Sequence, residues 1–262
     1  MRKQRFFLLT LIAFILGACQ KDELTLPTSV DVNFDLIPFT NNEIETQSAE
    51  ILLKNSSLSQ ANTPNQNTAP GLIKKMEIFK ASFFITDIII DGKREQGEDV
   101  YEKIPFDPPL EIKLDENTTV SQKLSFDIPQ GIYQKLNLQL FLGNEELPAL
   151  EFSGVVTSGK SQPVIFNYQF GLKQEITIQG KREDGRPTDN IILNKNQKEQ
   201  AYLTLDAAYF FKYFPVFLLT QHKKEELTEE STITISNKNE KDMPFFTTLQ
   251  GRLEESFSFV FE

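Results

Sequence analysis

The most regular feature of this chain is the alternation of apolar and polar residues over short segments. In residues 120–128 (VSQKLSFDI) the apolar side chains fall on one face of an extended chain and the polar ones on the other, and residues 132–142 (IYQKLNLQLFL) repeat the pattern. Because side chains of a β-strand point alternately to its two faces, both segments are predicted to be half-buried strands. Residues 129–131 (PQG) between them have turn chemistry, which predicts an antiparallel hairpin.

The same alternation recurs along the rest of the body and predicts an all-β fold. Further strands are expected at residues 30–39, 163–170, 175–179, 201–207, 231–235 and 256–262. Residues 76–90 (MEIFKASFFITDIII) change phase near residues 80–83, which predicts a β-bulge or a strand buried on both faces. In the last segment, Phe257, Phe259 and Phe261 are expected to face the core. Many short strands with little helix between them favour an antiparallel β-sandwich with Greek-key-like connections.

Two segments depart from this pattern. Residues 243–255 are expected to form one short C-terminal helix, with Asp242 as its N-cap and Pro244 in its first turn. Residues 54–70 are polar and contain no aromatic side chain, which predicts a mobile loop. The β-sandwich domain is therefore expected to span residues 30–262, and its length allows either one large sandwich or two smaller ones.

The first residues have the layout of a secretory signal peptide. A cationic start (Arg2, Lys3 and Arg5) precedes an apolar run over residues 6–16, and two small residues follow it. We therefore predict a signal peptide over residues 1–18. The apolar run has about half of the roughly 20 residues that a membrane-spanning helix needs, so a transmembrane anchor is not expected.

The only cysteine of the chain, Cys19, directly follows this segment. The sequence Leu16-Gly17-Ala18-Cys19 resembles the lipobox of bacterial lipoproteins, and this resemblance implies cleavage before Cys19 and acylation of its thiol. Lipoproteins of this type usually carry three acyl chains, which hold a protein on a membrane far more stably than one chain does. Residues 19–29 are then a lipidated tether, and the membrane is a partner through the lipid on Cys19. The alternative is a cysteine that merely follows an ordinary signal peptide.

The four residues after the cysteine indicate where such a lipoprotein is delivered. Gln20, Lys21, Asp22 and Glu23 resemble the surface-export signal of Bacteroidota lipoproteins, which implies the outer membrane, with the protein facing the cell exterior. The alternative is that they are only a hydrophilic part of the tether. As a whole, the body is similar to the transthyretin-like and pilin-like β-sandwich lipoproteins of Bacteroidota, although no diagnostic motif carries this similarity. A pilin would have an early arginine cleavage point, whereas the first arginine after the signal peptide is Arg94.

Composition argues against several classes of function. The net charge is −10, and removal of the signal peptide takes away three cationic and no acidic side chains, so nucleic-acid binding is not expected. The single histidine, His222, lies in a charged stretch, which argues against a Ser/His/Asp triad. One histidine and no free cysteine cannot build a copper or zinc site, and no cofactor is expected. Paired acids at Glu145-Glu146 and Glu254-Glu255 keep a carboxylate-dependent hydrolase as an alternative.

The densest aromatic segment, residues 208–215 (AYFFKYFP), supplies the candidate ligand contacts Tyr209, Phe211 and Tyr213. Aromatic side chains stack on sugars and anchor protein interfaces, but such a run also occurs in hydrophobic cores. The lack of tryptophan weakens the interpretation as a glycan site. The sequence thus predicts a non-catalytic, lipid-anchored surface protein that binds or scaffolds a protein or glycan partner. The alternatives are a pilus subunit and the carboxylate-dependent hydrolase.

A short sequence repeat occurs twice in the chain. Residues 88–97 (IIIDGKREQG) and 176–185 (ITIQGKREDG) share Gly-Lys-Arg-Glu in the same register. The repeat is explained either by a duplication of two sandwich halves or by two hairpin tips that acquired polar turn residues independently. In the second case the basic side chains are expected to be solvated, although a pair of basic tips could also hold an acidic ligand.

Overall fold

The structure is a computed structural model that describes most of the body of the chain. The described residues are 26–41, 73–115, 124–158, 163–171, 173–183, 190–195, 197–223, 232–247 and 249–262. The predicted signal peptide, Cys19, the export segment and the loop at 54–70 lie outside these ranges. Within them the chain is mostly β-structure with a few short helices, which confirms the all-β prediction at the level of fold class.

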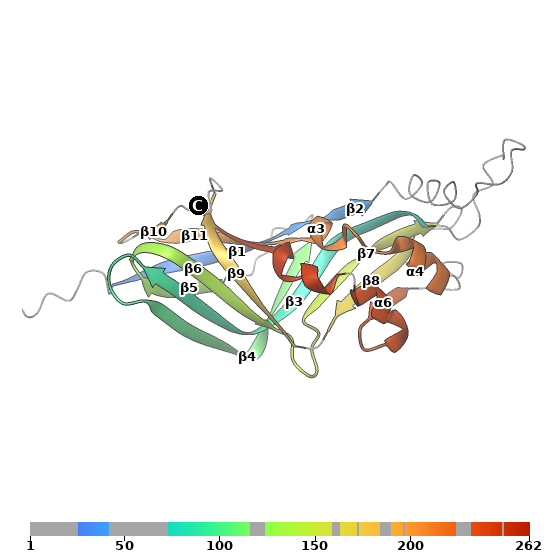
Figure 1. Ribbon diagram of the computed structural model, residues 1–262, viewed down its shortest axis with the longest axis horizontal. Coiled ribbons are helices and arrows are strands. Elements are labelled where there is room, and N and C mark those ends of the chain that lie inside the picture. Colours follow the sequence, from blue (N-terminus) through green and yellow to red (C-terminus); the bar gives the residue numbers. More distant parts are fainter. Residues whose placement is uncertain are drawn as a thin grey trace, which may run out of the picture.

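Strands follow one another along most of the chain, and the helical elements occur toward its end (Figure 1). The strands are β1 (Pro27–Ile37), β2 (Phe39–Asn41), β3 (Ile73–Arg94), β4 (Val100–Asp115), β5 (Leu124–Pro129), β6 (Gly131–Leu142), β7 (Leu150–Ser158), β8 (Val164–Phe170), β9 (Gln174–Arg182), β10 (Ile191–Leu193), β11 (Glu199–Asp206), β12 (Ile233–Ser236) and β13 (Phe257–Phe261). The helices are α3 (Ala207–Phe211), α4 (Val216–His222), α6 (Met243–Thr247) and the 3₁₀ turns η2 (Glu240–Asp242), η3 (Gln250–Arg252) and η4 (Glu254–Ser256).

All of these strands belong to one hydrogen-bonded sheet in the order β12-β8-β7-β3-β6-β9-β13-β11-β1-β5, with β10 on β6 and with β2 and β4 on β3. Strand β3 has 22 residues and links the two ends of the molecule (Figure 1). Its first half pairs with β7 and its second half with β6. We call β7, β8 and β12 the capped half, because α3, α4 and α6 gather there (Figure 1).

The sheet is mixed, so the prediction of purely antiparallel strands is wrong. Three pairs are parallel: β1 with β11, β8 with β12, and β9 with β13. Each of these pairs joins strands that are far apart in the sequence, as parallel pairing requires a long connection between the strands. Alternation alone does not report the direction of a neighbour, because a strand buries the same face beside either kind of partner.

The predicted hairpin at residues 120–142 is also wrong, although both of its strands exist. Strand β5 pairs with β1, whereas β6 pairs with β3, β9 and β10. The chain therefore crosses from one end of the strand order to its middle at Gln130. The backbone groups of this residue are satisfied from outside, because its N–H donates to Leu26 O at 2.9 Å and its carbonyl accepts from Arg94 Nη2 at 2.9 Å.

The predicted phase change in β3 is confirmed as a bulge, and a second bulge follows it. Within the described ranges, β3 has four register shifts, and the two in its interior lie between Ile78 and Lys80 and between Ile85 and Asp87. Each of these two shifts moves the buried positions by one residue and so keeps apolar side chains inside over a strand of this length. Opposite the first bulge lies Gly154, where a Cβ atom would stand only 1.8 Å from the Glu77 carbonyl oxygen. Glycine is therefore needed at this point.

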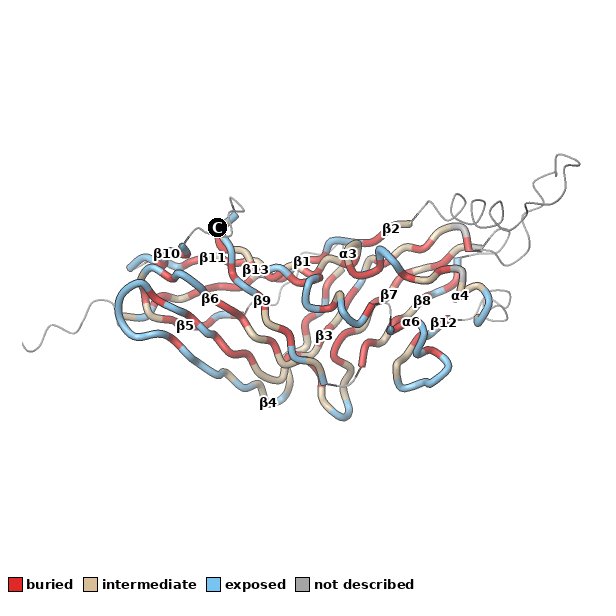
Figure 2. Tube along the Cα trace, in the orientation of Figure 1, coloured by how far each residue is buried: buried red, intermediate tan, exposed pale blue. Residues whose placement is uncertain are grey.

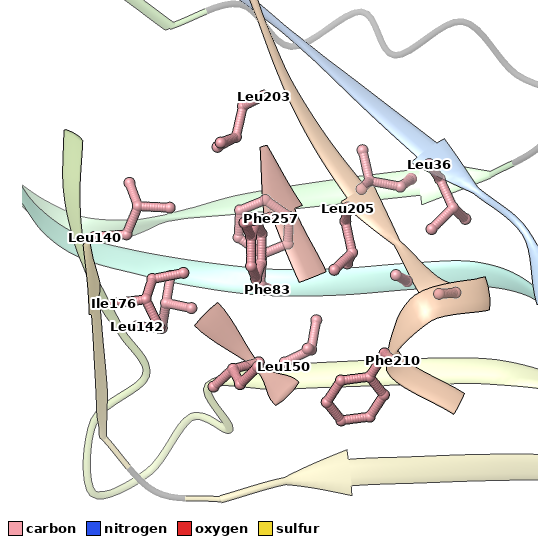
Figure 3. Packing of buried hydrophobic residues seen from close by; sticks show 14 of the residues in the cluster. Leu36, Phe83, Leu140, Leu142, Leu150, Ile176, Leu203, Leu205, Phe210 and Phe257 are labelled. Atoms are coloured by element: carbon pink, nitrogen blue, oxygen red, sulfur yellow. The ribbon is translucent and has the colours of Figure 1, made fainter. Parts of the chain in front are cut away.

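The hydrophobic core lies where the sheet folds back over β3. Buried and exposed positions alternate along most strands (Figure 2). Phe83 of β3 makes edge contacts with Phe34 of β1 at 6.1 Å and Phe257 of β13 at 5.6 Å between ring centroids, and Figure 3 shows Phe83 and Phe257 side by side. Phe257, Phe259 and Phe261 are all buried, which confirms their expected inward orientation.

The single predicted C-terminal helix is replaced by several shorter pieces. Residues 243–255 contain α6 flanked by 3₁₀ turns, and the aromatic run contributes α3. Asp242 does not cap this helix; its carboxylate turns back to accept from Ser236 N at 3.2 Å and Asn239 Nδ2 at 3.1 Å. It also lies 3.5 Å from Lys223 Nζ. These contacts hold the residue before α6 against β12 and α4.

Candidate functional site

The first candidate site is built on α3, a single helical turn at the end of β11. Asp206 caps this turn by accepting from Tyr209 N at 2.7 Å. Phe210 and Phe211 then point to the core, while Tyr209 and Tyr213, four residues apart, lie toward the solvent. Local capping and the apolar pair thus decide which tyrosines reach the surface.

Arg252 of η3 lies against both tyrosines. Its guanidinium carbon is 3.9 Å from the ring centroid of Tyr209 and 4.9 Å from that of Tyr213. Its Nε and Nη2 donate to Tyr209 O at 3.0 and 2.5 Å, which orients the guanidinium plane. Lys212 Nζ lies 5.5 Å from the Tyr213 centroid. Stacked cations of this kind are attracted to the negative faces of the rings.

Glu255 completes this group, which we call the tyrosine–arginine surface (Tyr209, Lys212, Tyr213, Arg252 and Glu255). The Tyr209 hydroxyl donates to the Glu255 carboxylate, and this hydrogen bond raises the pKa of Tyr209. Tyr213 is 58% exposed, and within the described ranges its hydroxyl makes no hydrogen bond. The surface therefore offers one exposed aromatic ring beside two cationic groups on an otherwise acidic protein.

The three residues singled out from the sequence have different positions. Tyr209 is half-buried and Tyr213 exposed, so both can meet a ligand from solvent. Phe211 is only 1% exposed and packs edge-on against Phe152 and Tyr168, so it belongs to the core. The prediction that Phe211 contacts a ligand is therefore wrong. Arg252 was missed, because nothing in the sequence near residue 252 indicates that it lies beside residue 209.

The second candidate site is a polar cavity of about 170 Å³ on the capped half. Glu151 and Gln169 contribute to its lining, and they alternate along their strands with the buried Phe152 and Tyr168, against which α3 packs. The cavity therefore opens on the sheet face opposite to α3. It is lined by Glu146, Pro148, Glu151, Gln169, Gly171, Ser236, Asn237 and Lys238.

The structure separates the paired acids that the sequence singled out. Glu254 accepts from Thr177 N at 3.2 Å, and Glu255 binds Tyr209. Glu146 and Glu151 both line the cavity, while Glu145 is not among the lining residues. In the described part of the chain, no three histidine, cysteine or acidic side chains gather as a metal site would require.

The two Gly-Lys-Arg-Glu segments have structural roles in the strands that flank β6. Arg94 is buried, and its Nη1 and Nη2 donate to Glu98 O at 3.1 Å and Gln130 O at 2.9 Å. Arg182 donates to the carbonyls of Glu262 and Ile192. The expectation of solvated basic tips is therefore wrong for Arg94, because its guanidinium satisfies backbone carbonyls where the chain turns.

Comparisons with known proteins do not indicate what either candidate site binds. A scan against protein-family models, a search of curated proteins and a search of solved structures each find no match to this chain. No helix in the described ranges has the length and apolar character needed to span a membrane. Function must therefore be argued from the two sites themselves.

Proposed function

We propose that this protein is a non-catalytic lipoprotein of the outer membrane, facing the cell exterior, that binds a protein or glycan partner through the tyrosine–arginine surface. The observation that carries the proposal is the exposed Tyr213 ring with both Arg252 and Lys212 close to its centroid. Tyrosine and arginine are the side chains most often found at energetic centres of interfaces. A ring and two cations together suit a partner that presents an acidic group beside an apolar face.

The surface is organised before any partner arrives. The Asp206 cap holds the start of α3, and Arg252 is fixed by its two hydrogen bonds to Tyr209 O. Binding then orders few additional side chains, which keeps the entropic cost of association low. Within the described ranges Lys212 forms no ion pair, so its ammonium group is available to a partner.

The lipid anchor supports a role close to the membrane. Strand β1 begins at Pro27, eight residues after Cys19. At roughly 3.3–3.6 Å per residue, a fully extended tether of this length reaches no more than about 30 Å from the lipid. The folded domain would therefore begin close to the outer face of the membrane.

We also propose that the sheet forms a two-layered β-sandwich with Greek-key-like connections. The contacts of Phe83 with Phe34 and Phe257 support this arrangement, because they bring β1 and β13 over β3. The position of β13 between β9 and β11, although it is last in the chain, supports long connections between neighbouring strands.

The binding proposal is tested by photo-crosslinking on the cells that make the protein. A photoreactive phenylalanine analogue is placed at Tyr213 and, as a control, at Tyr101, which is 71% exposed on β4. We expect one defined adduct from position 213 and none from position 101. Equal adducts from both positions, or none from either, would contradict the proposal, and a regular ladder of self-adducts would indicate a pilus subunit instead.

The location is tested separately by protease treatment of intact cells. The wild type is compared with Cys19→Ala and with a variant in which Lys21, Asp22 and Glu23 are replaced by Ala. We expect only the wild type to be cleaved at the surface. The wild type and the variant with Ala at 21–23 both keep Cys19 and should incorporate labelled fatty acid, whereas Cys19→Ala should not. Protection of the wild type until the outer membrane is opened would place the protein in the periplasm and refute the surface assignment.

A further inference from the structure

The polar cavity on the capped half has the organisation of a small-molecule site, and nothing in the proposed function uses it. Its floor is a row of polar side chains on three neighbouring strands: Glu151, Gln169 and Ser236 are register neighbours, and Ser82 of β3 lies opposite Glu151 just outside the lining. Gln169 Nε2 donates to Glu151 Oε1 at 2.9 Å, and Ser82 Oγ approaches Glu151 Oε2 at 3.5 Å. These contacts hold the Glu151 carboxylate flat on the sheet.

Two turns held by hydrogen bonds form the walls. On one side Asn144 Oδ1 accepts from the N–H groups of Glu146 and Leu147 at 2.9 and 2.8 Å. On the other side Asn237 Oδ1 accepts from Gly171 N at 3.0 Å, and Lys238 N donates to Ser236 Oγ at 3.3 Å. The walls are thus formed by the folded chain without a ligand.

The charges in the cavity are not balanced by the protein. It contains two carboxylates, Glu146 and Glu151, and one ammonium group, Lys238, and within the described ranges none of the three forms an ion pair. The remaining polar groups are the amides of Gln169 and Asn237 and the hydroxyl of Ser236. An occupant that uses all three charged groups would present a cation to the carboxylates and an anion to the lysine.

The size and lining of the cavity restrict this occupant further. Its 170 Å³ is below the about 300–1,000 Å³ of sites for drug-sized ligands, so the occupant is compact. No aromatic side chain lines it, so a pyranose ring would lack the usual stacking face. A calcium ion takes about 6–8 oxygen ligands, and here the ammonium group of Lys238 beside the two carboxylates would repel it.

We propose that this cavity binds a free α-amino acid with a short polar side chain. The ammonium group of the ligand lies between the carboxylates of Glu146 and Glu151, and its carboxylate meets Lys238 Nζ. The amides of Gln169 and Asn237 and the hydroxyl of Ser236 remain for its side chain. The two sites lie on opposite faces of the capped half, so this binding does not depend on the tyrosine–arginine surface.

The proposal is tested by calorimetric titration of the full chain with L-serine and L-glutamine. We expect saturable binding of at least one of them, with Kd below about 1 mM. Ethanolamine, which lacks the carboxylate, and lactate, which lacks the ammonium group, should each bind at least tenfold more weakly. Glu151→Gln and Lys238→Met should weaken amino-acid binding at least tenfold, whereas Glu102→Gln, on exposed β4, should leave it unchanged.

Three results would overturn the proposal. The first is that neither amino acid shows saturable binding to the wild type. The second is that ethanolamine or lactate binds as tightly as the amino acid. The third is that calcium chloride gives the only heat sensitive to Glu151→Gln, which would make the cavity a cation site. Because Lys238 is exposed, Lys238→Met keeps the test valid even where Glu151→Gln fails to fold. Tyr213→Ala should retain amino-acid binding. Failure of the calorimetric test would therefore leave the crosslinking test of the tyrosine–arginine surface unaffected, and the reverse is also true.

Discussion

Gly154 shows how one residue permits an irregularity in a long strand. The bulge between Ile78 and Lys80 brings the Glu77 carbonyl to the place where a Cβ atom of residue 154 would lie, 1.8 Å away. Backbone atoms cannot move aside as a flexible side chain can. The glycine is thus a requirement of the bulge, and the bulge keeps the apolar face of β3 inside.

We therefore expect Gly154→Ala to destabilise the protein by about 1–3 kcal/mol, as overpacking of a close contact does. Gly251→Ala is the matched control, because a Cβ atom at residue 251 would have no neighbour within 4 Å, and its effect should stay within about 0.5 kcal/mol. Urea unfolding of both variants measures the difference. Equal losses for the two variants would contradict the role of the bulge.

The two buried tyrosines are expected to respond oppositely to loss of their hydroxyl groups. The Tyr168 hydroxyl lies among aromatic rings and has no hydrogen-bond partner within the described ranges, whereas the Tyr133 hydroxyl donates to Pro129 O. A buried polar group without a partner costs free energy that a satisfied one does not. Tyr168→Phe should raise the free energy of unfolding by about 1 kcal/mol, and Tyr133→Phe should lower it by about the same amount. Denaturant titration at pH 7 measures both, and shifts of the same sign would refute the argument.

The same burial makes stability sensitive to alkaline pH. Burial raises the pKa of Tyr133 to about 12, against an ordinary value of 10.0, and nearby Arg94 opposes this shift only in part. The folded state therefore holds its proton more tightly than the unfolded state, and the contribution to stability is complete below pH 10 and is lost as pH rises toward 12. We expect the urea midpoint to fall between pH 9 and pH 11.5 in the wild type and less steeply in Tyr133→Phe. Parallel pH profiles would show that another group is responsible.

Among the secondary-structure elements, the short helices are the least predictable from the sequence. Period-two alternation marks strands over many residues, whereas α3 has five residues and depends on one cap and two buried rings. The aromatic run could therefore be assigned neither to the core nor to the surface as a whole. The residues of this run are divided between the two: Phe210 and Phe211 lie in the core, and Tyr213 lies at the surface.

The cap itself can be tested. Asp206→Ala removes the acceptor for Tyr209 N and should cost about 0.5–2 kcal/mol, the usual cost of losing an N-cap. Asp206→Asn keeps an oxygen acceptor and should retain most of this stability. Thermal unfolding distinguishes the two. An equally large loss in Asp206→Asn would show that the negative charge, and not the hydrogen bond, stabilises this turn.

At the scale of the whole molecule, the last strand holds the sheet together. β13 lies between β9 and β11, pairs parallel to the first and antiparallel to the second, and buries three phenylalanines. Truncation after Ser256 removes this strand and should abolish cooperative unfolding, because β9 and β11 lose their common neighbour. Ser258→Ala, at an exposed position of the same strand, should unfold as the wild type does. A truncated chain with an unchanged cooperative transition in circular dichroism would contradict this role.

The local pattern of residues was enough to assign many of the strands with their buried faces and to mark the phase change in β3, but it predicted no strand at β4, β7 or β10. These features depend on neighbours along the chain, since the two faces of a strand are read directly from alternate residues. Export and lipidation are likewise predicted from adjacent residues of the N-terminal segment. The cell experiments above test this prediction. Phe257, Phe259 and Phe261 were placed inside for the same reason.

The pairing of the strands and the residues that form the two candidate sites could be determined only from the tertiary structure. Local patterns do not relate the residues that these features join: the partners of β5 and β6, the parallel pairs, the approach of Arg252 to Tyr209, and the shared cavity of Glu146 and Gln169. An apolar face can be buried by any apolar partner, so alternation says that a face is covered without saying by what. The choice among partners is made by the packing of the whole core, and a binding site inherits its geometry from that choice.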